Sequence, residues 1–396
     1  MQNMLHTENI INAKTKQGGA SVRALLLPVL YLLGFIVSSD AVRFKFGVDL
    51  SFWFVVMLIA YYFLFYKKSI KDTKFYVWWI YLFVVPTLLM TLLKEGDMDH
   101  MIYCVLILLL PIALEPFIPE DDKTIKAGLY FVVVVSLMLL FLYANFGFLS
   151  NWNKNSMGYL LFLGFSALTI LLSCNRKSAW LWFFYAYAFV QLLVTESRNI
   201  SMAIITTMLL VILKNTVSKK TVFRVVYIVA LLYPAVFPLI AMELVGTPLY
   251  DFLAEITKDL YDKGQGGVFS GRIPIFEGAV VLIKKSPFHS LFGYGKTMVS
   301  FYAAHNGYYV LHYTFGLIGT LLIAGMLIFF FEKTRALVES GDSIAYGCFA
   351  IMISVLTQQA SEGWFLASYL LVLMPFVYMA IIIKRYRSVK RGLLKK

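Results

Sequence analysis

The chain has 396 residues, of which 60% are hydrophobic and only 14% are charged, and its mean hydropathy is +0.76. A soluble domain of this size needs far more polar surface, so the composition excludes a water-soluble protein and predicts one that lies in a membrane. Lysine and arginine outnumber aspartate and glutamate by 35 to 22, which gives a net charge of +13. That charge has to be explained by the same membrane location.

Apolar runs follow one another along the sequence, and most are long enough to cross a bilayer core of about 30 Å as a helix. The alternating pattern of a β-barrel is absent. We therefore expect an all-α, polytopic transmembrane helix bundle of about twelve spans. The expected spans cover residues 24–40, 49–66, 75–92, 101–118, 127–146, 156–173, 179–195, 199–214, 223–242, 306–331, 343–360 and 365–383.

The basic residues predict how the bundle is oriented. With the N-terminus in the cytoplasm, the inner segments carry most of the lysines and arginines, as the positive-inside rule requires. One inner cluster lies between Lys67 and Lys74, and Lys384-Arg385-Tyr386-Arg387 opens a basic tail, so both termini are expected to be cytoplasmic. The charge is then a topology signal that faces anionic lipid. No soluble basic module accompanies it, and we expect no nucleic-acid partner.

One long extramembrane loop, residues 243–305, is expected on the outer face between spans nine and ten. It separates residues 1–242, which hold spans one to nine, from residues 306–396, which hold spans ten to twelve and the tail. Apolar residues recur at helical spacing between Leu249 and Leu260, opposite a row of charges, which predicts an amphipathic helix on the membrane surface. A second helix is expected from Pro274 to Lys285.

Three residues near the outer face could carry chemistry. Arg198 lies where span seven ends and span eight begins, and Arg272 precedes the second loop helix. A guanidinium stays charged and can bind phosphate oxygens with two parallel hydrogen bonds. For Arg198 the alternative interpretations are an anchor in the lipid headgroups or an ion pair with Glu196. His305 stands at the start of span ten, and an imidazole can take a proton from a hydroxyl at neutral pH. A hydrogen-bonded interfacial histidine is the competing interpretation.

The supporting candidates are weaker. Lys285 suits the negative end of its own helix without any ligand. Tyr294 lies in the turn Phe292-Gly293-Tyr294-Gly295, and His312 shares a helical face with His305. No group of His, Cys, Asp or Glu has the spacing of a metal site, and no nucleophile elbow or Walker loop is present. We therefore expect that the protein binds no cofactor and that its chemistry needs no metal.

Taken together, these motifs resemble those of the O-antigen ligase and Wzy-type polysaccharide polymerase superfamily of bacterial surface glycan assembly. The resemblance rests on an arginine that opens a span, on a late outer loop, and on the order of short motifs within residues 196–319. Those motifs are Ser197-Arg198, Gly271-Arg272, Lys285-Ser286-Pro287-Phe288, Gly293-Tyr294-Gly295, His305-Asn306-Gly307-Tyr308 and Gly316-Leu317-Ile318-Gly319. Asn153-Lys154-Asn155 with Gly158 adds a further similarity.

The resemblance implies a metal-independent glycosyl transfer on the outer face of the bacterial cytoplasmic (inner) membrane. The donor and the acceptor would be glycans on undecaprenyl diphosphate, supplied by a flippase, and a chain-length regulator is a further implied partner. Arg198 and Arg272 would hold the donor diphosphate, and His305 would act as general base. Asn306, Tyr294, His312 and Lys285 would support them, and the attack would invert the anomeric carbon.

Two alternatives remain open. A ligase would use the same donor but transfer the finished polymer to lipid A–core, and nothing in the loop identifies the acceptor. A transporter of lipid-linked glycans would need charges deep in its spans and internal repeat symmetry. The sequence shows neither feature, which disfavours a transporter. We favour the polymerase over the ligase because the chain is rich in aromatic residues, with 34 Phe, 25 Tyr and 7 Trp.

Overall fold

The computed structural model describes residues 25–37, 50–65, 98–146, 154–193, 198–256, 272–295, 306–360 and 373–390, with a few single positions between 82 and 93 and residue 392. Every element in these ranges is a helix, as the absence of an alternating pattern predicts. The all-α fold class is therefore confirmed for the described part of the chain.

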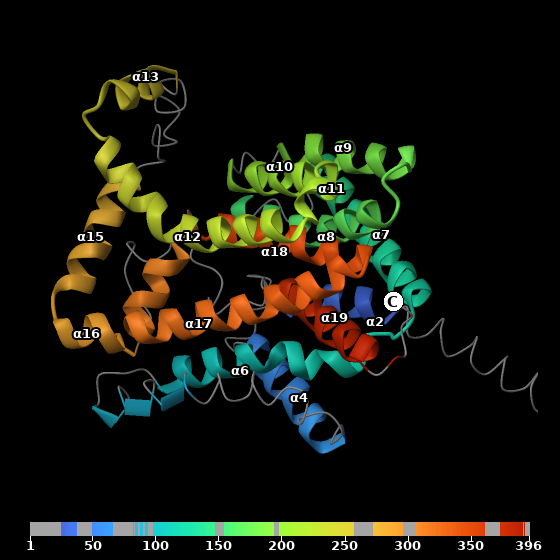
Figure 1. Cartoon of the computed structure of the whole chain (residues 1–396), viewed down its shortest axis with the longest axis horizontal. Coiled ribbons are helices and arrows are strands. Elements are labelled where there is room, and N and C mark those ends of the chain that lie inside the picture. Colours follow the sequence, from blue (N-terminus) through green and yellow to red (C-terminus); the bar gives the residue numbers. More distant parts are fainter. Residues whose placement is uncertain are drawn as a thin grey trace, which may run out of the picture.

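The helices follow the expected spans closely. Each expected range except 75–92, which lies largely outside the described residues, overlaps a helix (Figure 1). These helices are α2 (Leu26–Val37), α4 (Leu50–Phe65), α6 (Met98–Leu114), α7 (Asp122–Phe146), α8 (Lys154–Cys174), α9 (Ala179–Leu193), α10 (Arg198–Ile212), α12 (Lys220–Leu244), α17 (Gly307–Glu339), α18 (Ser343–Gln358) and α19 (Leu373–Lys390). The short helices η2 (Glu115–Phe117) and α11 (Lys214–Val217) join their neighbours.

Three of the described helices are long and apolar enough to cross a membrane, and they lie at Asp122–Leu142, Lys220–Leu244 and Gly307–Glu339. The chain is thus a membrane protein by the length and composition of these helices. Other apolar helices are 10–17 residues long, among them α18 and the apolar parts of α9 and α10. The number of spans and their orientation remain predictions.

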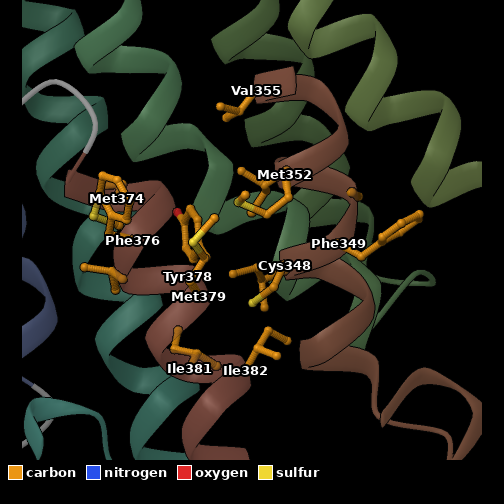
Figure 2. Close-up of a cluster of buried hydrophobic side chains, with 14 of the residues drawn as sticks. Cys348, Phe349, Met352, Val355, Met374, Phe376, Tyr378, Met379, Ile381 and Ile382 are labelled. Carbon is orange, nitrogen blue, oxygen red and sulfur yellow. The ribbon is translucent and has the colours of Figure 1, made fainter. Parts of the chain in front are cut away.

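Helix α18 forms the centre of the bundle. It packs against α8, α10, α12, α17 and α19, and nearly all of its side chains are buried. Figure 2 shows Cys348 and Met352 of α18 beside Tyr378, Met379 and Ile382 of α19, where they fill the space between the two helices. A helix covered by protein on all sides needs no polar face, which explains why the sequence of α18 is apolar all round.

Charged side chains gather at one end of the bundle, which we call the ionic end. Arg385 pairs with Asp122 at 2.6 Å and with Asp342 at 2.5 Å. Arg387 pairs with Glu115, and both side chains are 5% exposed. These pairs join the starts of α7 and α18 and the 3-10 helix η2 to the last turns of α19.

The ionic end corrects one expectation about the chain terminus. Residues 384–387 were expected to follow the last span as a basic tail, whereas α19 continues to Lys390. Lys384, Arg385 and Arg387 are at least nine-tenths buried. The helix extends because acidic partners from three other segments neutralise its basic residues, and a buried charge persists when it is paired.

The sequence predicts that the connections found at the ionic end, such as those between α8 and α9 and between α17 and α18, all lie on the cytoplasmic side of the membrane. Lys214, after α10, donates to the Ser173 carbonyl near the end of α8 at 2.8 Å and to Ser343 Oγ at the start of α18 at 2.7 Å. Helix α18 has 16 residues, so its far end lies about 24 Å away at 1.5 Å per residue.

The expected loop helices are present, the first of them as far as Ile256, because residues 257–271 lie outside the described part of the chain. Helix α13 (Pro248–Ile256) is amphipathic and exposes Leu249, Phe252 and Ile256. Helix α15 (Ile273–Lys284) has proline in its first turn. Pro287 ends α15 as expected, but it also begins α16 (Pro287–Phe292), which the sequence analysis did not predict. Figure 1 shows α13, α15 and α16 together at one side of the molecule.

Candidate functional site

The start of α17 is fixed by the side chain of Asn306, which is 2% exposed. Asn306 Oδ1 accepts hydrogen bonds from the backbone N–H groups of Tyr308 at 3.0 Å and Tyr309 at 2.9 Å, so it caps the helix. Its Nδ2 donates to the Pro234 carbonyl of α12 at 2.8 Å and to the Ala360 carbonyl after α18 at 3.0 Å. One amide therefore joins three elements, at the end of the bundle opposite the ionic end. We call it the Asn306 end.

Helix α15 lies beside the first part of α17 and runs parallel to it. Near the two helix starts, the rings of Phe276 and Tyr309 meet edge to face with their centroids 6.3 Å apart. Near the other ends, Tyr294 donates from its hydroxyl to the Leu282 carbonyl at 3.1 Å and stacks on Tyr313 at 4.5 Å. The contacts follow the same order along both helices, so the two N-termini lie side by side.

Arg272 is the N-cap residue of α15 and is half-buried. Its carbonyl accepts the first helical hydrogen bond, from Phe276 N at 2.9 Å. Phe276 in turn contacts both Phe237 of α12 and Tyr309 of α17. Arg272 is therefore one helical turn from the packing contact that joins α15 to the start of α17.

Arg198 is the first residue of α10, whose N-terminus also lies at the Asn306 end. Helices α10 and α18 are antiparallel, because Ser354 Oγ donates to the Ala203 carbonyl at 2.9 Å and Tyr346 Oη donates to the Leu210 carbonyl at 2.5 Å. Arg198 precedes Ala203 by about 8 Å of helix, and the end of α18 follows Ser354 by a similar length. The structure thus brings the backbone of Arg198 to the level of Asn306.

His305 lies outside the described residues. Its neighbour in the chain, Asn306, is held between α12, α17 and the end of α18. The backbones of Arg198, Arg272 and Asn306 thus belong to one end of the bundle, and the role of His305 remains a prediction.

Two of the glycine motifs contact each other, one in the turn after α16 and the other in the first third of α17. Helix α17 is interrupted at Gly316, whose φ of 66° and ψ of −175° are not helical. The interruption frees carbonyls of the preceding turn. Tyr294 N donates to the Tyr313 carbonyl at 2.8 Å and Gly295 N donates to the Thr314 carbonyl at 3.0 Å. The turn after α16 therefore completes the hydrogen bonding of the broken helix.

Only glycine fits where these two segments touch. A Cβ at Gly293 would lie 2.3 Å from the Thr314 carbonyl oxygen, and one at Gly316 would lie 2.2 Å from the Leu291 carbonyl oxygen. Both glycines also have positive φ. We call this contact of residues 291–295 with residues 313–316 the glycine clasp. It corrects the expectation of one uninterrupted helix over residues 306–331.

The supporting candidates divide between packing and the surface. Tyr294 stacks between His289 and Tyr313, and His312 Nε2 lies 2.9 Å from the Ser290 carbonyl oxygen. Packing of the glycine clasp accounts for these contacts without a ligand. Lys285 is exposed at the far end of α15, about 20 Å from Arg272 along the helix. The structure does not bring Lys285 and Arg272 together.

The arrangement favours an anion at the Asn306 end. Helix N-termini carry partial positive charge, and α10 and α15 begin there with N-termini that could face an anion, whereas the first N–H groups of α17 already donate to Asn306 and Gln359. Arg198 and Arg272 add formal positive charge at the N-termini of α10 and α15. Among the residues that the structure describes, no three His, Cys, Asp or Glu side chains are grouped as a metal site requires.

Sequence reasoning missed the role of α12 in this site. Pro234 and Pro238 both lie inside the helix and are buried. A proline has no N–H, so Pro238 leaves the Pro234 carbonyl without its helical donor. Two prolines four residues apart in a predicted span were the signal that could have revealed a partner from another helix.

Comparison with models of protein families gave no match. Comparison with curated proteins likewise found no significant similarity.

Proposed function

We propose that the chain is a membrane glycosyltransferase that polymerises undecaprenyl-diphosphate-linked repeat units into a surface polysaccharide. The reaction takes place on the outer face of the bacterial cytoplasmic membrane and needs no metal. The donor is the growing glycan on its lipid carrier, and the acceptor is the terminal sugar of a new lipid-linked unit.

The observation that carries this proposal is that two helix starts, each with an arginine, lie at the Asn306 end of the bundle. Helix α10 begins with Arg198, and α15 begins after Arg272, beside the capped start of α17. Each N-terminus favours an anion by about 0.3–1 kcal/mol, and a guanidinium adds charge-assisted hydrogen bonds. A diphosphate is the kind of anion that such an end suits.

The proposed step is a displacement at the anomeric carbon of the donor. The acceptor hydroxyl oxygen forms the new glycosidic bond while His305 takes the hydroxyl proton. The bond from the anomeric carbon to the diphosphate oxygen breaks, and undecaprenyl diphosphate leaves with the electron pair. Arg198 and Arg272 stabilise the charge on that leaving group. Attack from the face opposite the diphosphate inverts the configuration.

Surface glycan from cells that carry single variants tests the proposal. Arg198→Ala, Arg272→Ala and His305→Ala are each expected to lower the amount of polymer by about 100-fold or more at equal protein abundance. Lys284→Ala is the matched control, because Lys284 is an exposed cation at the opposite end of α15. Polymer of normal length and amount from His305→Ala would overturn the catalytic assignment.

The deletion strain distinguishes the polymerase from the ligase. A polymerase deletion leaves single repeat units on the surface, because transfer to the core continues without chain growth. A ligase deletion accumulates long polymer on the lipid carrier with none attached to the core. The second result would replace the proposed acceptor but keep the donor chemistry.

A further inference from the structure

We propose that Asn306 is a positioning residue which uses the proline-freed carbonyl of Pro234 to hold the start of α17, the segment that directly follows His305 in the sequence, against α12 and α18. This inference rests on the proposed function for its catalytic consequence. The tether itself rests only on contacts in the structure.

The carbonyl of Pro234 in α12 lacks its usual helical donor. In a regular helix the carbonyl of residue 234 would accept from the N–H of residue 238. Residue 238 is proline, so that donor does not exist. The carbonyl belongs to a buried residue, where an unpaired acceptor is costly. Asn306 Nδ2 supplies the missing donor at 2.8 Å.

The amide of Asn306 uses its full hydrogen-bonding capacity. Asn306 can donate two hydrogen bonds through its amide nitrogen, and both go to carbonyls of other elements, Pro234 and Ala360. Its oxygen accepts two more from Tyr308 and Tyr309. A side chain that is 2% exposed and makes four hydrogen bonds has one orientation available. The backbone at Asn306 is therefore fixed relative to three helices.

The close packing around the next residue supports the same conclusion. Gly307 N donates to the Gln359 carbonyl at 2.8 Å. A Cβ at Gly307 would lie 2.3 Å from Gln359 Oε1, so the start of α17 lies directly against the end of α18. His305 directly precedes this fixed point in the sequence, which is why we expect the tether to matter for catalysis.

The test uses Asn306→Ser with and without Pro238→Ala in the purified full-length protein. Serine keeps an oxygen that can cap α17 but loses the amide donors. Alanine at 238 restores a helical N–H for the Pro234 carbonyl without restoring the tether. The double variant therefore distinguishes two roles of Asn306: donating a hydrogen bond to the buried Pro234 carbonyl, and holding α17 in position.

Three quantities are measured: the melting temperature, the deuterium uptake of residues 307–315, and kcat and KM for glycan chain growth. We expect Asn306→Ser to speed exchange at the start of α17 by about tenfold and to lower kcat by about tenfold or more with little change in KM. Adding Pro238→Ala should recover the melting temperature but neither the exchange rate nor kcat. Pro238→Ala alone should exchange as the wild type does.

The outcomes separate this inference from the proposed function. Unchanged exchange and kcat in Asn306→Ser would overturn the tether, and so would recovery of kcat in the double variant. If the wild-type protein extends no glycan, the proposed function fails. The deuterium uptake of Asn306→Ser then still decides whether Asn306 holds α17.

Discussion

At the scale of single residues, the glycine clasp shows how a backbone contact can depend on the absence of one carbon atom. Gly316 has a conformation that other residues almost never adopt, and its Cα faces the Leu291 carbonyl. Both features are needed for the turn after α16 to reach the interrupted part of α17.

We predict that Gly316→Ala destabilises the protein by more than the 1–3 kcal/mol that the backbone conformation alone costs. Thermal unfolding in detergent measures the effect. Gly341→Ala is the matched control, because Gly341 has a φ of 89° but nothing within 4 Å of its added Cβ. Equal effects of the two substitutions would show that the contact with Leu291 contributes nothing.

The buried pair of Arg387 and Glu115 gives a second prediction at this scale. Glu115→Ala leaves a guanidinium in a buried site and should destabilise the protein by about 3–5 kcal/mol. Replacing both residues, by Arg387→Met and Glu115→Leu, should recover most of that loss. Chemical unfolding measures the two variants, and a double variant less stable than Glu115→Ala would contradict the explanation.

At this scale the sequence identified residue types better than their partners. Pro274, shortly after Arg272, predicted a helix start at that point, because proline is tolerated in the first turn of a helix and the signal is local. The role of Asn306 was not predictable, because its acceptors lie on α12 and after α18, far away in the sequence. The burial of Arg387 was missed for the same reason.

At the scale of elements, α13 is the helix whose surroundings the sequence predicts most directly. Leu249, Phe252 and Ile256 form an exposed apolar row, because they are spaced by three and four residues along the helix. Asp251 and Glu255 lie outside that row. Such a helix suits the boundary between lipid and water.

We predict that a tryptophan at 252 contacts lipid. In vesicles that contain brominated lipid, Phe252→Trp fluorescence should be quenched strongly, whereas Asp251→Trp should be quenched weakly, because the two side chains point to different faces. Native tryptophans are replaced by phenylalanine so that the signal is specific. Weak quenching at both positions would place α13 away from the membrane.

The pattern of apolar runs predicted where helices lie, but two of the elements differ from the expectation. Helix α17 is interrupted at Gly316, and α16 is an additional helix. Glycine and proline signal a break, yet whether a segment bends there depends on the partner that satisfies the freed hydrogen bonds. That partner is a long-range feature.

At the scale of the whole molecule, the bundle has two chemically different ends. Paired charges occupy the ionic end around Arg385 and Asp342, and the starts of α10, α15 and α17 occupy the Asn306 end. The expected spans alternate in direction, and their order places the connections of the ionic end on one side of the membrane and the starts of α10, α15 and α17 on the other. The sequence could predict this because hydrophobic length and loop position determine it. Which end faces the outside rests on the positive-inside rule.

Labelling of single cysteines tests that orientation. In a variant whose three native cysteines are replaced by alanine, a reagent that does not cross membranes should label Glu277→Cys in intact spheroplasts, because Glu277 is exposed and lies near the start of α15. It should label Ser340→Cys, near the ionic end, only after the membrane is broken. Labelling in the reverse order would invert the topology and remove the Asn306 end from the outer face.

If the Asn306 end transfers glycan from a lipid diphosphate, the purified protein should extend glycan chains without any other component. Wild-type protein in detergent, given undecaprenyl-diphosphate-linked repeat units and EDTA, should produce a ladder of longer chains. Arg272→Ala and His305→Ala should do so at least about 100-fold more slowly. No chain growth by the wild-type protein, or growth at the wild-type rate by His305→Ala, would contradict the account.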